Sequence, residues 1–128
     1  MIDHVSLGIS NLTRARKFYD AALRPLGYKM VWPIPGYGFG YGATKDAPKF
    51  WIGLPLAKRR KPKASAGSHV AFTAESRKAV DAFYRAALKA GGKDNGKPGL
   101  RADYGENYYA AFVVDPEGYR LEAYTSGK

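Results

Sequence analysis

The chain of 128 residues has no cysteine, and this absence excludes several kinds of chemistry. Without thiols the chain itself can form no disulfide, no zinc thiolate site and no cysteine nucleophile. The absence fits a cytoplasmic protein, although a chain without cysteine is stable in either redox environment. No apolar run approaches the roughly 18 residues needed to cross a bilayer, and the start, Met1-Ile2-Asp3-His4, lacks the basic and apolar stretches of a signal peptide. We therefore expect no membrane partner.

Acidic residues are also scarce. The chain has 11 Asp and Glu but 21 Lys and Arg, which gives a net charge of +10. This excess favours small anionic substrates and raises the question of nucleic-acid binding. Part of it lies in one run, Lys58-Arg59-Arg60-Lys61-Pro62-Lys63. Such a run between two regular segments is typical of a solvated linker. Nucleic acid is therefore kept only as the weakest of the candidate partners.

Only two histidines occur, and they stand at matching points of an internal repeat. From His4 to His69 and from Phe18 to Phe83 the offset is 65 residues, and Leu23 and Leu88 continue the match. A repeat of a whole strand–helix unit predicts two copies of one module. The pattern predicts an α+β protein in which each module is βαβββ.

The expected module boundaries are residues 1–56 and 68–128, joined by a basic linker at 57–67, within one structural domain. The second module contains the strong turn Asp115-Pro116-Glu117-Gly118. The glycine-rich stretch at 36–42 is interpreted as a flexible hairpin over the pocket, and Asn95-Gly96 as a turn. The expected strands are 3–9, 28–34, 37–43, 48–54, one beginning at 68, 93–103, 107–114 and 119–125. One expected helix ends near Arg24, and the other spans 76–90.

Each histidine shares a strand face with small residues. Alternation places His4 with Ser6 and Gly8, opposite an apolar face. In the second copy His69 shares its face with Ala71 and Thr73. Small side chains leave a concave space above a sheet, and a histidine beside such a space is a better metal ligand candidate than one in a packed core.

A third ligand is offered by Glu122, a charged residue in the middle of the last strand. Two imidazoles and one carboxylate suit a divalent ion such as iron, manganese, nickel or zinc, with positions left open for substrate. Symmetry would place a fourth ligand in the stretch Lys49 to Leu54, which has none. Gly53 is taken as the equivalent position, so a site of three ligands is preferred. A lone histidine is more often structural, and it is the matching pair with Glu122 that favours a metal.

These residues resemble the vicinal oxygen chelate superfamily, which includes glyoxalase I, extradiol dioxygenases, fosfomycin-resistance thiol transferases and bleomycin-binding proteins. The likeness covers nearly the whole chain and is specific to the superfamily rather than to one member. The stretch from Tyr104 to Phe112 is most similar to a glyoxalase-like group of unassigned chemistry. The matching motifs are His4-Val5-Ser6-Leu7, Arg16-Lys17-Phe18-Tyr19, Gly67-Ser68-His69-Val70-Ala71-Phe72 and the run from Asp115 to Glu122.

The resemblance implies paired βαβββ modules that curl into a cupped, half-open barrel sheet. It places His4, His69 and Glu122 on the metal-ligand positions. Small members are usually homodimers, and modules from two chains can complete each site, so pairing within one chain or across a dimer stays open. Glyoxalase I generally has a fourth, acidic ligand, so Gly53 argues against a lactoylglutathione lyase.

The expected function is that of a metal-dependent lyase, isomerase, thiol transferase or dioxygenase acting on a small, oxygenated, anionic substrate that chelates the ion. The alternative is a metal-free protein of the same fold that sequesters a small molecule. Glu122 is the expected catalytic residue, and no general base can be named beyond Glu106 as a loop candidate. The residues expected to contact substrate are Arg120, Arg101, Trp51, Tyr104 and Tyr109, with Tyr108 beside them.

Overall fold

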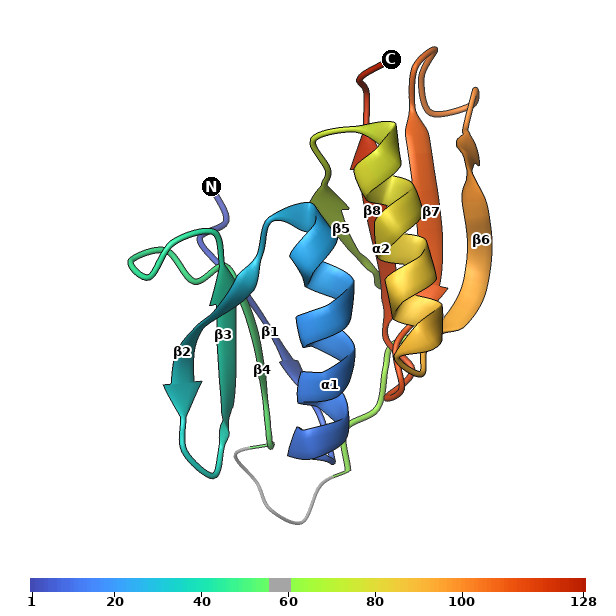
Figure 1. Cartoon of the computed structure of the whole chain (residues 1–128). Coiled ribbons are helices and arrows are strands. Elements are labelled where there is room, and N and C mark those ends of the chain that lie inside the picture. The colour runs from blue at the N-terminus through green and yellow to red at the C-terminus, as the bar shows by residue number, and fades with distance from the viewer. Residues whose placement is uncertain (56–60) are drawn as a thin grey trace.

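The structure is a computed structural model that describes residues 1–55 and 61–128. Figure 1 shows two modules of the same βαβββ order, which confirms the predicted α+β class. Residues 58–60 of the basic run lie outside the described residues. The first module consists of β1 (Val5–Gly8), α1 (Leu12–Leu23), a short 3₁₀ helix (Arg24–Leu26), β2 (Lys29–Ile34), β3 (Gly38–Gly42) and β4 (Phe50–Gly53). The second consists of β5 (Val70–Thr73), α2 (Arg77–Lys89), β6 (Lys93–Leu100), β7 (Tyr109–Val114) and β8 (Arg120–Thr125).

Both long helices begin at a side-chain cap that the local sequence supplies. The Asn11 side chain accepts a hydrogen bond from the Arg14 backbone N–H at 2.9 Å. Ser76 accepts one from the Ala79 N–H at 3.1 Å. Such caps satisfy backbone donors that have no partner in the first helical turn. The first helical segment ends at Gly27, whose φ of 84° is a left-handed conformation that glycine tolerates.

The two four-stranded sheets have the same topology. Their strand orders are β1-β4-β3-β2 and β5-β8-β7-β6, with the first strand of each module parallel to the last. The remaining pairs are antiparallel. Among the described residues no strand of one sheet is hydrogen bonded to the other sheet. The strands that follow the two histidines, β1 and β5, therefore each have a free edge.

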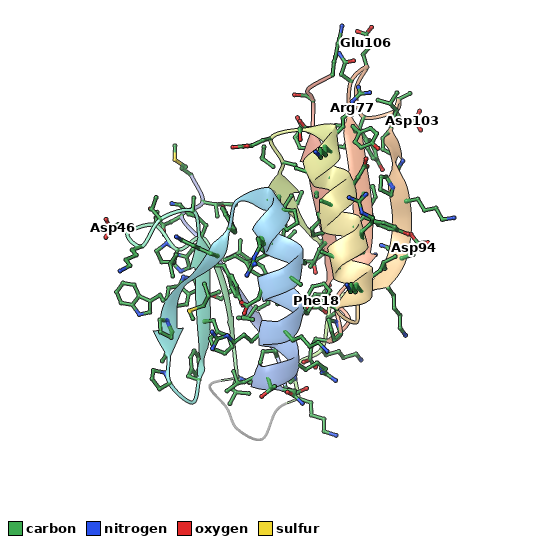
Figure 2. All side chains as sticks on the ribbon, viewed as in Figure 1. Phe18, Asp46, Arg77, Asp94, Asp103 and Glu106 are labelled. Atoms are coloured by element: carbon green, nitrogen blue, oxygen red, sulfur yellow. The ribbon has the colours of Figure 1, made fainter. Side chains whose placement is uncertain are left out.

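The two helices join the modules into a common core. Figure 1 shows α1 and α2 side by side on one side of the two sheets. Phe18 of α1, labelled in Figure 2, and Phe83 of α2 are both fully buried. Across the module boundary the rings of Phe50 and Phe72 meet edge to face at 5.2 Å. Burial of these faces by the helices leaves the opposite face of each sheet free of the core.

The turn between β7 and β8 also ties the modules together. The carboxylate of Asp115 is buried and accepts hydrogen bonds from the backbone N–H groups of Glu117, Gly118 and Tyr119 at 2.7–2.9 Å. Its second oxygen accepts the hydroxyl of Tyr19 from α1. Burial raises the pKa of Asp115 above its usual range, against the effect of these donors.

The structure tests two sequence interpretations of glycines. The stretch 36–42 is part of the β2–β3 hairpin, as expected, and most of it is strand β3 (Gly38–Gly42), which pairs on both sides with β2 and β4 and agrees with the strand expected at 37–43. Asn95-Gly96 is not a turn, because it lies inside β6, where the register with β7 shifts around Gly96. A φ of 147° at Gly96 accommodates this irregularity.

Candidate functional site

The open face of the second sheet carries a buried carboxylate paired with a histidine. Glu122 of β8 stands between Ala71 of β5 and Phe112 of β7, and its side chain is only 4% exposed. Its Oε1 lies 3.1 Å from Nε2 of His69, which precedes β5. The imidazole is half exposed, at 51%. The parallel pairing of β5 with β8 therefore brings two of the three predicted ligands together, one just before β5 and one on β8.

The hydroxyl of Tyr108 contacts the other oxygen of this carboxylate. It donates to Glu122 Oε2 at 2.5 Å, and the Tyr108 ring stacks on that of Tyr124 at 4.3 Å. Burial, followed by the bond to the Glu122 carboxylate, raises the pKa of Tyr108 well above its usual range. Sequence reasoning missed this contact. The available signal was the alternation of Tyr108 with Phe112, which places both residues on the face of Glu122.

The geometry of the His69–Glu122 pair fits a shared divalent ion. Ligand bonds from imidazole nitrogen and carboxylate oxygen to such ions are about 2.0–2.2 Å long. Two donors at right angles around one ion are therefore about 3.0 Å apart, and two at a tetrahedral angle about 3.4 Å apart. The observed 3.1 Å between Nε2 and Oε1 falls within this interval, and it is equally the length of the hydrogen bond that the pair forms without a metal. Imidazole with carboxylate is also a donor set that first-row divalent ions prefer.

The third predicted ligand, His4, is not part of this group. It precedes β1 in the other module, its side chain is half exposed, and its Nδ1 lies 2.8 Å from Asp3 Oδ1. In the part of the chain that the structure describes, no three His, Asp or Glu side chains gather closely enough to hold a metal ion. One chain thus presents His69 with Glu122 in one place and His4 in another.

The strand register identifies the residue of the first module that corresponds to Glu122. Ser6 of β1 is paired with Trp51 of β4, and Ala71, 65 residues after Ser6, is paired with Glu122 of β8. Trp51 is therefore the equivalent of Glu122. The assignment of Gly53 to this position was wrong, because Gly53 is paired with Gly8, two residues further along each strand. An aromatic side chain stands where a fourth, acidic ligand would be expected.

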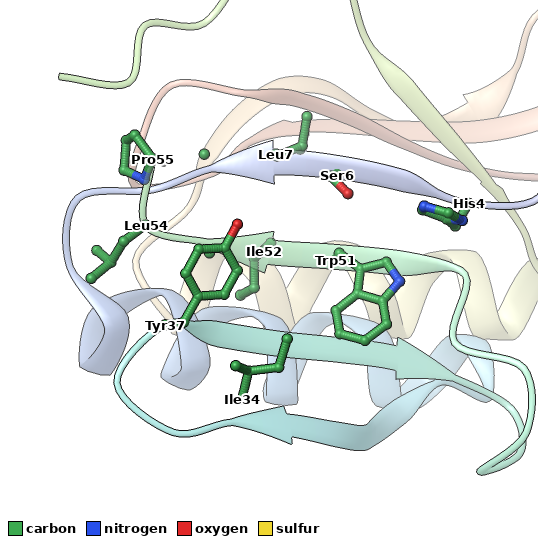
Figure 3. A pocket seen from close by; sticks show the side chains of 11 residues that line it. His4, Ser6, Leu7, Ile34, Tyr37, Trp51, Ile52, Leu54 and Pro55 are labelled. Atoms are coloured by element: carbon green, nitrogen blue, oxygen red, sulfur yellow. The ribbon is translucent and has the colours of Figure 1, made fainter. Parts of the chain in front are cut away.

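Trp51 and His4 line a cavity of about 390 Å³ on the open face of the first sheet. Figure 3 shows the side chains of Trp51, Tyr37 and Ile34 on the face of the sheet turned away from α1. His4 and Ser6 provide polar groups at the β1 side of the cavity. The cavity thus combines an apolar lining with few polar groups, which is the usual character of a small-molecule site.

The two predicted arginines lie near the His69–Glu122 pair but have other contacts. Arg120 lines a small cavity with His69, and its guanidinium donates to the backbone oxygens of Ala66 and Ser68. Arg101 lies over the ring of Phe112, with 5.3 Å from its Cζ to the ring centroid, and donates to the Lys97 carbonyl at 2.6 Å. Both cations border the face that carries Glu122.

The predicted tyrosines divide between the two faces of the second sheet. Tyr104 is 67% exposed, and its ring meets that of Tyr108 edge to face at 5.3 Å. Tyr109 is not brought to the pair, because its hydroxyl donates to Asp81 of α2 at 2.7 Å on the face opposite Glu122. Figure 2 shows Glu106 at the tip of the loop between β6 and β7, pointing away from the sheet.

Comparison with known proteins assigns the chain to a family. The family model described as Glyoxalase/Bleomycin resistance protein/Dioxygenase superfamily matches residues 1–123. The chain belongs to this superfamily. The predicted resemblance is thereby confirmed. No curated protein matches the chain.

Solved structures of the glyoxalase superfamily agree with this assignment. A glyoxalase/bleomycin resistance protein from Albidiferax ferrireducens T118 is 31% identical with a TM-score of 0.83, and 97% of each chain is covered. A lactoylglutathione lyase from Agrobacterium tumefaciens is 17% identical with a TM-score of 0.63, covering 97% of this chain and 92% of that one. A glyoxalase I mutant from Zea mays is 24% identical with a TM-score of 0.67, and the match covers 96% of this chain and 45% of the maize chain. These last two likenesses show the shared fold. The described part of the chain has no helix long and apolar enough to span a membrane.

Proposed function

We propose that this protein is a metal-dependent enzyme whose small, oxygenated, anionic substrate chelates a divalent ion through two neighbouring oxygen atoms. The observation that carries the proposal is the 3.1 Å approach of His69 Nε2 to Oε1 of the buried Glu122. The buried Glu122 carboxylate already has hydrogen-bond partners in Tyr108 and His69, and a cation held between the carboxylate and the imidazole would in addition neutralise its charge. The ion would be iron, manganese, nickel or zinc.

We further propose that His4 of a second copy of the chain completes the ligand set in a homodimer. Each chain carries both halves of a site, with His4 on one module and His69 with Glu122 on the other. A two-fold symmetric pair of chains would therefore form two identical sites. The free edges of β1 and β5 support this arrangement, because an unpaired strand edge is a ready place for another chain to add.

The chain's own residues would bind the substrate and orient the ligands. The metal, when bound, supplies a Lewis acid that stabilises negative charge developing on the substrate oxygens. Tyr108 holds Glu122 Oε2, which leaves Oε1 directed toward His69. Arg101 at the border of this face and the net charge of +10 favour an anionic substrate.

Metal analysis of protein purified without chelator tests the proposal. We expect a stoichiometric divalent metal in the wild type and its loss in Glu122→Ala, with an unchanged far-UV circular dichroism spectrum. Glu106→Ala is the matched control, since it removes an exposed carboxylate from the tip of a loop. Full occupancy in Glu122→Ala, or a wild type that binds none of the four metals when they are added, would contradict the proposal.

A second candidate function is metal-free sequestration of a small molecule by the same fold. Trp51 favours it, because an aromatic side chain fills the register position that corresponds to Glu122. The net positive charge disfavours cationic ligands. A protein that retains no metal, and whose affinity for its ligand is unchanged by Glu122→Ala, would favour this candidate over the first.

A further inference from the structure

The floor of the first module's cavity is built from aromatic rings that lie on glycines. One row of paired residues crosses the sheet from Ser6 through Trp51 and Gly40 to Trp32. The Trp51 ring covers Gly40 so closely that a Cβ added there would lie 2.9 Å from both Cη2 and Cζ3 of the indole. Any side chain at Gly40 would therefore force this ring to shift.

The neighbouring row repeats the arrangement. It runs from Gly8 through Gly53 and Gly38 to Ile34, so three glycines in succession hollow the sheet. The Tyr37 ring lies in this hollow, and a Cβ added to Gly53 would be 2.9 Å from its Cε2 and 3.1 Å from its Cζ. Gly53 therefore serves to seat an aromatic ring.

We call Trp51 and Tyr37, seated on Gly40 and Gly53, the aromatic floor. Figure 3 views both rings nearly face-on, so their flat sides are turned toward the cavity. No Asp or Glu is among the described residues that line this cavity, and its polar side chains include His4 and Ser6. A flat aromatic surface stacks best with another planar π system, and such a pair contributes beyond the area that it buries.

We propose that the substrate carries a planar aromatic ring that stacks on the aromatic floor, with its anionic, oxygen-bearing end toward His4. The cavity of about 390 Å³ suits a molecule of one or two rings. This inference rests on the proposed function, because the ring belongs to the substrate whose oxygens would chelate the metal. The floor itself contains none of the proposed ligands, so ring binding can be measured without metal.

The test compares two acids that differ in planarity. Binding of 2-naphthoate and of the saturated decalin-2-carboxylate is measured by calorimetry and tryptophan fluorescence, with protein that is first metal-depleted and then metal-loaded. We expect 2-naphthoate to bind about tenfold more tightly, since one stacked aromatic pair is worth about a factor of ten. Trp51→Leu should markedly reduce this preference, because only the Tyr37 ring of the floor remains, and Trp51→Phe, which keeps a flat ring, should retain most of it.

A glycine variant tests the seating of the ring without changing the ring. Gly40→Ala should displace the indole and lower the affinity for 2-naphthoate about tenfold. Gly67→Ala is the matched control, because a Cβ there meets nothing within 4 Å. If Gly40→Ala does not fold, Trp51→Leu and Trp51→Phe still decide the question.

Equal affinity for the two acids, or a preference that Trp51→Leu leaves unchanged, would overturn the inference. Failure of the proposed function looks different. If the protein prefers 2-naphthoate but retains no metal, the inference about the aromatic floor is supported and the metal proposal is wrong. If the protein binds metal at Glu122 but does not prefer 2-naphthoate over the saturated acid, the metal proposal is supported and the inference about the aromatic floor is wrong.

Discussion

A mixing experiment would decide whether each proposed metal site draws its ligands from two chains. His4→Ala and Glu122→Ala are prepared separately, and each is expected to retain no metal. His4 is half exposed, so its removal leaves the core intact. A dimer of one His4→Ala chain and one Glu122→Ala chain has two sites. One site receives both substitutions. The other receives none, because it combines the intact His4 of one chain with the intact His69 and Glu122 of the other. Metal binding should therefore return on mixing.

The size of the recovery follows from counting. Random exchange makes about half of all dimers mixed, and each mixed dimer has one intact site of two, so about a quarter of the wild-type metal should return. His69→Ala mixed with Glu122→Ala is the matched control. Those two residues lie 3.1 Å apart in one chain, so every site in the mixed dimer contains a defect and no metal should return.

The assay is unfolding of the two variants in urea, joint refolding and metal analysis after gel filtration. Wild-type protein carried through the same steps reports losses from refolding. If His4→Ala and Glu122→Ala recover no metal while the wild type does, ligands from two chains do not meet in one site. If His69→Ala with Glu122→Ala recovers as much as the test pair, subunit sharing is not the cause.

Three further outcomes concern stability and can be measured by urea denaturation. Tyr108→Phe leaves Glu122 Oε2 without its donor and should lower the free energy of unfolding by about 1–3 kcal/mol. Asp115→Ala leaves the Tyr19 hydroxyl and three backbone N–H groups without an acceptor and should lower the free energy of unfolding by about 3 kcal/mol or more. Tyr19→Phe removes only one of these bonds and should lower it by about 1 kcal/mol. Equal losses for the two variants would contradict the role of the carboxylate. Because burial raises the pKa of Asp115 above 3.8, the folded state holds this proton more tightly than the unfolded state. The stability of the wild type relative to Asp115→Asn should therefore fall as the pH rises from about 4 through the raised pKa, and a constant difference would contradict the direction of the shift.

Much of the fold follows from local patterns that the sequence displays directly. The constant offset between His4 and His69 predicts two modules, and alternation along the first strand of each predicts which face meets its helix. Ser76 caps α2 at the start of the helix expected at 76–90. The match of the superfamily model to residues 1–123 agrees with the family likeness. These features depend on neighbours within one segment, so one sequence suffices to predict them.

The features that sequence analysis missed depend on pairing between distant strands. The equivalence of Trp51 with Glu122 needs the register of β4 against β1, which no local pattern specifies. The role of Gly40 is visible only when the ring that covers it is known. The contact of Tyr108 with Glu122 likewise joins residues on a loop and a strand. The meeting of His4 with the other ligands stays a prediction about a second chain.

The correspondence of Trp51 with Glu122 has a consequence for how proteins of this kind can diversify. One half of the repeat carries a carboxylate at this position and the other an indole, in the same backbone setting. Substitutions on the indole side could therefore change which molecules are accepted while the carboxylate side stays untouched. With Glu122 and Trp51 in the roles proposed above, a duplicated scaffold of this type would separate selectivity from reactivity, so that each could be engineered on its own.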